Sequence, residues 1–497
     1  PVILVVNCTR ITRSVAALIN GVVNFDRRIQ IGGVILNQVA RARHEKIMLQ
    51  SIERYCDVPV LGSLPKSKEV EIPDRHLGLI PAGEQDMLQN RIFLLGKLVQ
   101  ENVDLSKLLQ LSSNGVPLSE EKVLEIHKAE EKVKIGVLGT GAISGIYLQN
   151  LTELFQEVEI IAVCDLFKEK AQEASQKYHI PRVYDTMEEL FADKEVEIVL
   201  NLTRPGEHYC TTKAALLAGK HVYSEKPLAA TYGEGLELAE LARRQGLLLG
   251  GAPDTFLGAG IQTCRRLIDD GMIGDVIGAQ ARMVCHGHES WHPAPEFYYQ
   301  CGGGPMMDMG PYYLTALVNL VGRVKNISGM TRCSFPQRTI TSQPKKGTVI
   351  DVEVPTHIAG LLQFENGAIG TVLTTFDVYY DRQACLEIYG TKGTLEVPDP
   401  NCFGGPIRLL RPQDGSFKEM PLLYDYRENS RGLGVADMAK ALRTGRSVRA
   451  DVQQTLHVLE ILTTFEKSSQ EGRTLDLASP YERRAAMPDM AVPGILD

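Results

Sequence analysis

The stretch that decides the fold is Lys132–Gly145, which reads KVKIGVLGTGAISG. Its first half is a short apolar run, and such a run is typical of a buried parallel strand. The run ends at Gly139 and Gly141, and a helix-compatible pattern begins at Ala142 and Ile143. The order of strand, glycine turn and helix start predicts a place where backbone N–H groups can hold a pyrophosphate.

A second feature strengthens this interpretation, because the glycine pair by itself is weak evidence. The third position of the dinucleotide fingerprint falls on Ser144 rather than on a glycine. The next apolar run, Val158–Cys164, ends in Asp165 at the distance where an acid binds a cofactor ribose. The predicted cofactor-binding residues of this part are Gly139, Gly141, Ala142, Ile143 and Asp165.

The residues around Asp165 also bear on the choice of cofactor. A carboxylate at this position accepts hydrogen bonds from ribose hydroxyls and repels a 2′-phosphate. Leu166 and Phe167 follow it, rather than an arginine that would neutralise such a phosphate. We therefore predict NAD as the cofactor, with NADP possible because Lys168 and Lys170 are close in the sequence.

Composition limits the class of protein. The chain has 497 residues, 44% hydrophobic and 23% charged, with a net charge of −8. This length corresponds to roughly three domains. The negative net charge does not favour binding to nucleic acid or to an anionic membrane. The ten cysteines are scattered without a C-x-x-C pair, and no apolar run is long enough to span a membrane. We expect a cytoplasmic protein whose true beginning is missing, because the sequence opens on Pro1.

The first hundred residues alternate apolar strand and helix patterns, which predicts a parallel sheet. The segments PVILVVNCTRITRS, GGVILNQV, RHEKIMLQSIE and RHLGLIPAGE resemble the synthetase domain of cobyrinic acid a,c-diamide synthase over about residues 1–111. That family activates a corrin carboxylate with ATP and Mg²⁺ and amidates it with ammonia from glutamine. The chain holds no G-x-x-x-x-G-K-[ST] phosphate loop. We therefore expect a partial P-loop-like α/β segment without ligase activity.

Residues 112–131 are polar and charged, which is typical of a linker. Strand and helix patterns alternate again over 132–250, as in a dinucleotide-binding domain. From 251 to 479 long alternating runs rich in β-branched residues follow one another, which predicts an open, mainly antiparallel sheet. Residues 480–497 form a tail without a regular element. The predicted fold class is α/β throughout.

Six motifs in order carry a second resemblance, over about residues 132–477. They are GVLGTGAIS, AVCDLF, NLTRPGEH, SEKPLA, GGGPMMDMGPYYLTALVNLVG and EIYGTKGTLEV. Together they resemble the Gfo/Idh/MocA family of NAD(P)-dependent oxidoreductases. The resemblance implies a Rossmann domain, then an α/β domain whose open sheet supports substrate binding and homo-oligomer contacts. It also implies a small-molecule substrate, namely a sugar, cyclitol or related polyol.

The lysine of the segment Glu225-Lys226-Pro227 matches the catalytic lysine of that family. An ammonium aimed at the reacting oxygen stabilises the alkoxide that develops as hydride leaves carbon. Glu225 is expected either to orient Lys226 or to contact the cofactor. The family segment along the nicotinamide ribose is matched by Thr203, Pro205 and His208.

Asp308 and Tyr312 lie four residues apart on a helix that three glycines, 302–304, introduce. This spacing predicts that both side chains lie on one helical face. The family has Asp and His here, as substrate binder and proton-transfer group, and Tyr312 replaces the histidine. A phenol titrates near 10, so proton transfer at neutral pH needs an adjacent cation such as Lys226. The alternative is a packing tyrosine, as Tyr313 beside it illustrates.

The histidine cluster of the chain consists of His286, His288 and His292 around Trp291. No cysteine or carboxylate completes a zinc-binding spacing, so no metal is predicted. We expect a loop that lines the substrate site, with Trp291 as a stacking face for a sugar and with His292 and Asp308 as substrate-binding groups.

Two other classes of function remain as alternatives. One is an ATP-dependent amide ligase fragment of corrinoid synthesis, which residues 1–111 favour. The other is a non-catalytic dinucleotide-binding sensor, which the retained Lys226 and Asp308 argue against.

Overall fold

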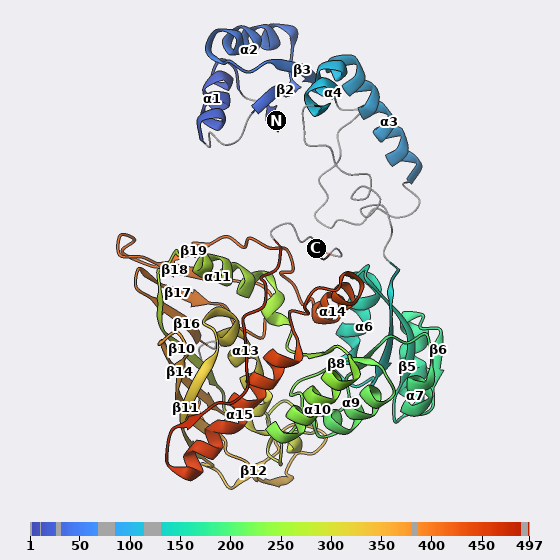
Figure 1. The fold of residues 1–497 in the computed structure, drawn as a ribbon, viewed down its shortest axis with the longest axis vertical. Coiled ribbons are helices and arrows are strands. Elements are labelled where there is room, and N and C mark those ends of the chain that lie inside the picture. Colours follow the sequence, from blue (N-terminus) through green and yellow to red (C-terminus); the bar gives the residue numbers. More distant parts are fainter. Residues whose placement is uncertain are drawn as a thin grey trace. The chain divides into compact units, whose positions relative to one another are not determined.

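A computed structural model describes residues 2–9, 11–25, 31–67, 85–113, 131–379, 385–488 and 496. The chain forms two compact units, Pro1–Ala129 and Glu130–Asp497 (Figure 1). The second unit contains both sheets that bear on the candidate site. The finer boundaries at 250 and 479 stay predictions.

The first unit contains a parallel sheet in the order β1-β2-β3. The strands are Val2–Asn7, Ile31–Val39 and Val60–Pro65. The helices are α1 (Val15–Phe25), α2 (Ala42–Tyr55), α3 (Gln85–Asn102) and α4 (Leu105–Ser113). The predicted alternation of strand and helix is confirmed, and most of the predicted linker lies outside the described residues.

The second unit begins with a six-stranded parallel sheet in the order β6-β5-β4-β7-β8-β9. Its strands, in chain order from β4, are Val133–Leu138, Val158–Cys164, Arg182–Tyr184, Ile198–Asn201, His221–Ser224 and Leu249–Gly251. The strand order runs outward in opposite directions from β4 and from β7. Ligands of open α/β sheets bind beyond the carboxyl ends of the strands at such a switch point.

The helices of this domain follow the strands, as the sequence pattern predicted. They are α6 (Ser144–Glu153), α7 (Lys168–Tyr178), α8 (Met187–Ala192), α9 (His208–Leu217) and α10 (Tyr232–Gln245). Thr231 starts α10 with a capping box, in which its hydroxyl accepts from the Glu234 N–H. Gly246 ends the same helix in the left-handed conformation that favours glycine.

A nine-stranded sheet follows in the order β19-β18-β17-β16-β10-β15-β14-β11-β20. All its neighbouring strands are antiparallel except β10 and β15, so the predicted mainly antiparallel sheet is confirmed. Its longer strands are β10 (Val276–Val284), β11 (Val324–Arg332), β14 (His357–Phe364), β15 (Ile369–Thr375), β16 (Cys385–Gly390) and β17 (Gly393–Val397). The shorter ones are β18 (Ile407–Leu410), β19 (Lys418–Met420) and β20 (Leu475–Asp476).

Helices cover one face of this sheet. They are α11 (Ala259–Asp269), α13 (Gly310–Leu320) and α15 (Val452–Glu471), with α14 (Leu433–Thr444) closer to the parallel sheet. Helix α15 packs against β11 and also against α10, so it joins the two domains of the second unit (Figure 1). The loops also contain a small hairpin, β12 (Gln337–Thr339) and β13 (Val349–Asp351).

The expectation of one continuous helix through Asp308 and Tyr312 is wrong. Helix α12 (Gly304–Asp308) ends before α13 begins at Gly310. Pro311 explains the break, because it has no N–H to continue the helical hydrogen bonds. Asp308 is therefore the last residue of one helix, and Tyr312 lies in the first turn of the next.

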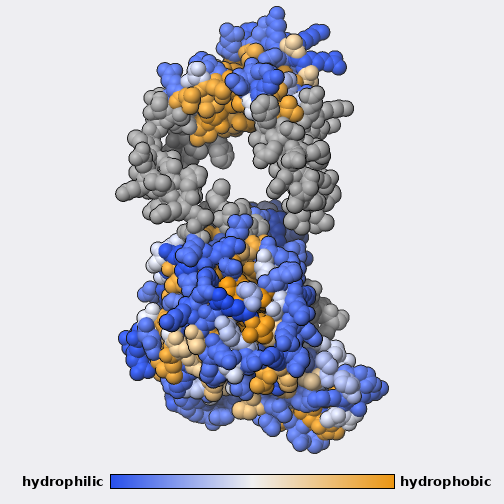
Figure 2. Space-filling view, turned by 90° about the vertical axis from the view of Figure 1, so that its right-hand side faces the viewer, coloured by the Kyte–Doolittle hydropathy of each residue, from blue (hydrophilic) through white to orange (hydrophobic). Residues whose placement is uncertain are grey.

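The tail after residue 480 carries no helix or strand over 480–488 but packs onto the second unit. Tyr481, Met487 and Leu496 are buried. Among the described helices, none combines the length and the apolarity needed to cross a membrane. The surface of the unit in Figure 2 is largely polar, with separate apolar patches.

Candidate functional site

The glycine turn after β4 has the geometry that the sequence predicted. Gly139 has φ +97°, and an added Cβ would lie 2.8 Å from backbone atoms of Leu202, so no side chain fits. A Cβ on Gly141 would meet nothing within 4 Å, which leaves open space above the turn. The Ser144 hydroxyl donates to the Gly141 carbonyl at 2.8 Å and thereby fixes the start of α6. An open backbone turn at a helix N-terminus fits a dinucleotide pyrophosphate.

Asp165 lies at the end of β5 and faces this turn. Its Oδ2 accepts from the Thr140 N–H at 2.6 Å and from the Thr140 hydroxyl at 2.9 Å. Its Oδ1 accepts from the Phe167 N–H at 2.8 Å. Each carboxylate oxygen has more than one lone pair, so Asp165 can hold the turn and still accept from a ribose hydroxyl.

The two nearby lysines are engaged elsewhere. Lys168 Nζ lies 2.6 Å from a carboxylate oxygen of Asp185. Lys170 Nζ lies 4.9 Å from the ring centre of Phe167. Neither contact directs an ammonium to the place where Asp165 would repel a 2′-phosphate, which supports the preference for NAD.

We expect the chain to bind NADH more tightly than NADPH, because the Asp165 charge opposes the added phosphate. Asp165→Asn keeps the hydrogen-bond acceptor and removes the charge, so it should narrow the difference between the two dissociation constants. Glu169→Gln, an exposed charge removal on α7, is the matched control and should change neither. Cofactor fluorescence titrations measure all four constants, and equal affinities in wild type would contradict this assignment.

The segment after β8 presents Lys226. Glu225 is buried, and its Oε1 accepts from the Tyr147 hydroxyl at 2.8 Å. Its Oε2 accepts from the Lys226 N–H at 2.9 Å. The bond from the Lys226 N–H supports the orienting role for Glu225, and the remaining lone pairs of its oxygens leave a contact with the cofactor open.

The Lys226 side chain extends from the six-stranded parallel sheet to the domain that contains the nine-stranded sheet. Its Nζ donates to the Asp308 carbonyl at 2.6 Å and to Asp308 Oδ1 at 3.0 Å. The same Nζ lies 5.3 Å from the ring centre of Tyr312. The break between α12 and α13 thus still leaves both predicted partners beside the ammonium.

Lys226 and Asp308 each stabilise the charged form of the other. Burial opposes the charge of Lys226, but the Asp308 carboxylate, with Tyr312 and Glu225, raises the pKa of the ammonium above its usual value. Burial likewise acts to raise the pKa of Asp308, yet Lys226 outweighs it and the pKa is lowered. Both groups are therefore ionised at neutral pH, and the site holds a fixed positive charge next to a carboxylate.

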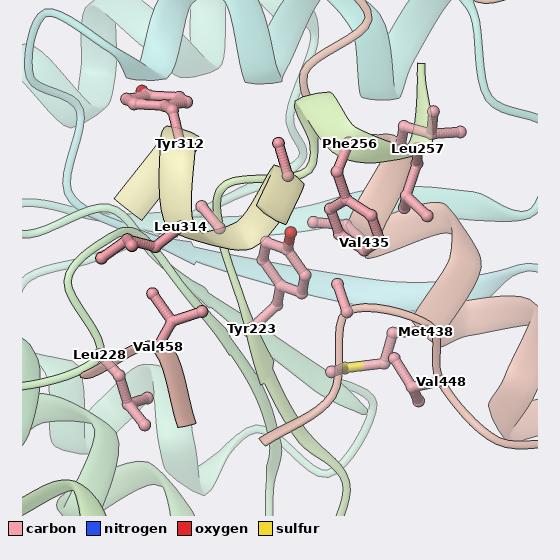
Figure 3. Close-up of a cluster of buried hydrophobic side chains, with 14 of the residues drawn as sticks. Tyr223, Leu228, Phe256, Leu257, Tyr312, Leu314, Val435, Met438, Val448 and Val458 are labelled. Carbon is pink, nitrogen blue, oxygen red and sulfur yellow. The ribbon is translucent and has the colours of Figure 1, made fainter. Parts of the chain in front are cut away.

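Tyr312 is 8% exposed, whereas Tyr313 beside it is 1% exposed. Figure 3 shows Tyr312 at the edge of the buried cluster and Tyr223 inside it. The positive charge of Lys226 was expected to lower the pKa of the Tyr312 phenol, and it does so, but the effect of burial is larger. Burial raises the pKa of Tyr312 and Lys226 lowers it, with a net increase.

His208 does not point a free ring nitrogen at the proposed cofactor. Its Nδ1 lies 2.7 Å from the Pro227 carbonyl oxygen, and its Nε2 lies 2.9 Å from the Thr203 carbonyl oxygen. Burial lowers the pKa of His208, although both carbonyls favour the protonated ring. His208 therefore ties the loop after β7 to the turn that carries Lys226, while Thr203 is half-buried and Pro205 is exposed.

The histidine loop after β10 reaches Asp308 through His288. Its Nε2 lies 3.6 Å from Asp308 Oδ2, which is too long for a hydrogen bond but close enough for a charge contact when the ring is protonated. The ring packs against Tyr298 at 4.2 Å and Phe376 at 4.6 Å between centroids. His288 Nε2 is buried and has no hydrogen-bond partner in the described structure.

The other residues of this loop differ in their surroundings. Trp291 is 61% exposed and lies edge-on to His288, with 5.3 Å between ring centroids. His292 Nδ1 accepts from the Ala294 N–H at 3.0 Å, and burial lowers the pKa of its ring. His286 stacks on Tyr379 at 3.6 Å. The roles of Trp291 and His292 toward a substrate stay predictions.

Two residues near the site were not found from the sequence, because they come from distant segments. Arg431, on the loop before α14, lies close enough to Tyr312 for its positive charge to lower the pKa of the phenol, against the larger effect of burial. Asp254, after β9, is buried, and its Oδ2 accepts from the Gly432 N–H at 2.9 Å and the Gly434 N–H at 3.0 Å. The two glycines of NSRGLG, residues 429–434, are compatible with a turn, but no local pattern indicates Asp254 as its partner.

Asp254 leads to a prediction about pH and stability. Burial raises the pKa of Asp254 to about 6, against the two N–H donors and Arg431. The unfolded carboxyl titrates near 4, so the folded state holds this proton more tightly. The resulting stabilisation is present below about pH 4 and is lost as pH rises through about 6, with ~3 kcal/mol as an upper limit.

Asp254→Asn should remove this dependence. Urea unfolding at several pH values within this window should show a smaller loss of stability in the variant than in wild type as pH increases. Asp270→Asn, on the exposed C-terminus of α11, is the control. Identical pH profiles for wild type and Asp254→Asn would show that the carboxyl does not titrate as described.

Family models match both domains of the second unit. Residues 133–251 match the oxidoreductase family with an NAD-binding Rossmann fold, and residues 261–396 match the GFO/IDH/MocA C-terminal domain. The second unit is thus an NAD-binding oxidoreductase built from a Rossmann domain and an open-sheet domain. The chain belongs to the GFO/IDH/MocA family over residues 133–396.

The first unit has relatives of another kind. Residues 5–80 match the CobQ/CobB/MinD/ParA nucleotide binding domain. The chain is 48% identical over 119 residues to cobyrinate a,c-diamide synthase of Listeria monocytogenes, which is 24% of this chain and 26% of that protein. A longer match, which extends beyond the first unit, is 32% identity over 243 residues to the enzyme of that name from Archaeoglobus fulgidus, covering 48% of this chain and 50% of that protein. The chain therefore spans between a quarter and a half of these relatives.

Solved structures share the fold of the second unit. An NAD binding oxidoreductase from Klebsiella pneumoniae has a TM-score of 0.63 at 21% identity and covers 70% of this chain and 100% of its own. Levoglucosan dehydrogenase in complex with NADH and L-sorbose has a TM-score of 0.62 at 18% identity, and the match covers 70% of this chain and 99% of that protein. Aldose-aldose oxidoreductase from Caulobacter crescentus has a TM-score of 0.59 at 22% identity, and the match covers 70% of this chain and 100% of that protein. At these identities the likeness concerns the fold.

Proposed function

We propose that the second unit oxidises or reduces a hydroxyl-bearing carbon of a sugar, cyclitol or related polyol. The observation that carries this proposal is the contact between Lys226 and Asp308. It joins the end of β8, in the parallel sheet of the Rossmann domain, to the open-sheet domain. A reacting hydroxyl beside this ammonium would be next to both domains.

The residues of the site have separable tasks in this proposal. When bound, the nicotinamide supplies or takes up the hydride. Lys226 stabilises the negative charge that develops on the substrate oxygen. Tyr312 exchanges the proton of that oxygen as general acid or base. Asp308 fixes Lys226 and accepts from a neighbouring substrate hydroxyl through a remaining lone pair.

The surroundings of the site support a polyhydroxylated substrate. Asp308 and His288 offer polar atoms, while Trp291 and Tyr298 offer ring faces on the same loop. Such a combination suits sugars, whose hydroxyls need partners and whose C–H faces pack on aromatic rings. Two structures of the same fold carry sugar names, levoglucosan dehydrogenase with L-sorbose and aldose-aldose oxidoreductase.

A fluorescence titration tests this proposal. NADH should bind to the chain, and a panel of aldoses, ketoses, cyclitols and linear polyols should change the fluorescence or affinity of bound NADH for at least one member. NADH binding without response to any of these compounds would support the sensor alternative. Absence of NADH binding would contradict the assignment of the glycine turn.

Self-association through the open sheet is a further part of the proposal. Ile277, Leu361 and Ile369 lie on β10, β14 and β15 and are exposed. Exposed apolar side chains of neighbouring strands support an interface of this sheet with a second copy. Light scattering should give a mass above that of one chain, and Leu361→Lys should lower it.

The first unit is proposed to be dispensable for the redox reaction. It forms a separate compact unit, and the described contacts of Lys226, Asp308 and Tyr312 lie within residues 130–497. A chain that begins at Glu130 should therefore keep NADH binding and turnover, and the full chain should show no ATP-dependent amidation of a corrinoid acid. Loss of all turnover on removing residues 1–129 would contradict this.

A further inference from the structure

We propose that Tyr147 is a positioning residue that holds Lys226 in place by acting through Glu225. This inference rests on the proposed role of Lys226. The Tyr147 hydroxyl donates to Glu225 Oε1 at 2.8 Å, and the Lys226 N–H donates to Oε2 of the same carboxylate at 2.9 Å. One carboxylate thus connects the tyrosine to the backbone from which the Lys226 side chain starts.

The Glu225 carboxylate depends on these two donors. Glu225 is 8% exposed, and Tyr147 is fully buried. Among the hydrogen bonds of the described residues, the Glu225 side chain accepts from the Tyr147 hydroxyl and from the Lys226 N–H. Burying a charged oxygen without a hydrogen-bond partner is costly. Loss of the tyrosine hydroxyl would therefore favour a new position of the carboxylate and of the lysine backbone bonded to it.

The Tyr147 phenol is a permanent donor at neutral pH. Burial, together with the negative charge of Glu225, raises the pKa of this phenol well above its usual value. A neutral phenol can donate to a carboxylate, whereas a phenolate can only accept. Tyr147 therefore acts by holding Glu225 and takes no part as an acid or base.

The place of Tyr147 in the fold gives this contact a function. The residue lies in the first turn of α6, the helix that begins at the glycine turn. At the other end of the connection, the Lys226 ammonium donates to Asp308 in the open-sheet domain. The helix proposed to hold the cofactor and the ammonium proposed to face the substrate are therefore linked by hydrogen bonds. A shift of Lys226 would misplace its charge relative to the reacting oxygen.

Labelling of lysines with acetic anhydride, followed by peptide mass spectrometry, tests the position of Lys226 without turnover. In wild type the Asp308 carboxylate raises the pKa of Lys226 against the effect of burial, so this amine should react slowly. In Tyr147→Phe it should react about threefold faster or more, because the fraction of free amine increases about tenfold for each unit by which the pKa falls.

Tyr223→Phe is the matched control for this experiment. Tyr223 is also fully buried, and Figure 3 shows it within the apolar cluster. Its hydroxyl has no hydrogen-bond partner in the described structure. Lys226 should therefore be labelled at the wild-type rate in Tyr223→Phe. Equally faster labelling in both variants would overturn the specific role of Tyr147.

A double variant keeps the test decisive if Tyr147→Phe does not fold. Tyr147→Phe combined with Glu225→Leu leaves no buried carboxylate without its donor, and replacing both partners of a buried hydrogen bond by apolar groups can be nearly neutral for stability. Lys226 should be labelled faster in this protein as well. Labelling of Lys226 at the wild-type rate in folded Tyr147→Phe, or in the double variant, would overturn the proposal.

Turnover gives a second measurement. We expect Tyr147→Phe to lower kcat by about tenfold to 10²-fold, the effect of a small misplacement of a reacting group, with little change in the KM of the substrate. Added to Lys226→Met, Tyr147→Phe should cause no further loss, because it acts only through Lys226. Additive losses would overturn the proposal. Absence of turnover in wild type would contradict the proposed redox function, whereas the labelling rates would still decide the role of Tyr147.

Discussion

Lys226→Met should lower kcat by about 10²–10³, because it removes the positive charge that stabilises the developing oxyanion. The dissociation constant of NADH should change little. The glycine turn and Asp165, which are proposed to hold the cofactor, do not contact the Lys226 ammonium in the described hydrogen bonds. Initial rates and a fluorescence titration on the same preparation measure the two quantities.

Stability must be followed in the same variant, because its substitution leaves the Asp308 carboxylate without the ammonium. Removing one partner of a buried pair typically costs about 3–5 kcal/mol. Lys213→Met, which breaks an exposed ion pair with Glu237, is the control for charge removal. A folded Lys226→Met protein with a kcat close to wild type would show that Lys226 is structural.

Tyr312→Phe should lower kcat by about 10²–10⁴, the range typical of a lost general acid or base. The substitution removes one hydroxyl and little volume, so the fold should persist. Tyr313→Phe is a closely matched control, since it removes a hydroxyl from the next residue of the same helix. We expect Tyr313→Phe to turn over near the wild-type rate.

The double variant of Lys226 and Tyr312 tests whether the two residues act as a unit. Losses at groups that serve one step do not add. Lys226→Met combined with Tyr312→Phe should be scarcely slower than Lys226→Met alone. If Tyr312→Phe turns over at the wild-type rate, His288 is the next candidate for the proton, because its Nε2 lies 3.6 Å from Asp308.

Local sequence patterns sufficed for much of the fold. The apolar run before Gly139 and the acid at Asp165 predicted the first strands of the Rossmann sheet, which the structure confirms, and NAD as the cofactor, which the family model of an NAD-binding Rossmann fold confirms. The placement of the cofactor at Gly139, Gly141 and Asp165 stays a prediction. Alternating β-branched runs predicted the mainly antiparallel sheet that contains β10, β14 and β15. These elements were predictable because burial on one or both faces of a sheet leaves a periodic signal.

The site was harder to predict where it depends on contacts between distant segments. Arg431 lies near Tyr312, although the two are far apart in the sequence. Asp254 likewise accepts a hydrogen bond from the distant loop before α14. No spacing rule connects them. The break at Pro311 shows a different limit, because Asp308 and Tyr312 were expected on one helix and meet Lys226 from two. The net pKa of Tyr312 likewise depends on burial, which a motif does not reveal.

The most direct test of the central claim follows NADH formation in wild type and Lys226→Met, with NAD and the sugar and polyol panel as substrates. The account predicts NADH formation with at least one member of the panel in wild type. It also predicts a loss of about 10²–10³ in Lys226→Met at unchanged NADH affinity. No NADH formation with any member, or equal rates in both proteins, would contradict the account.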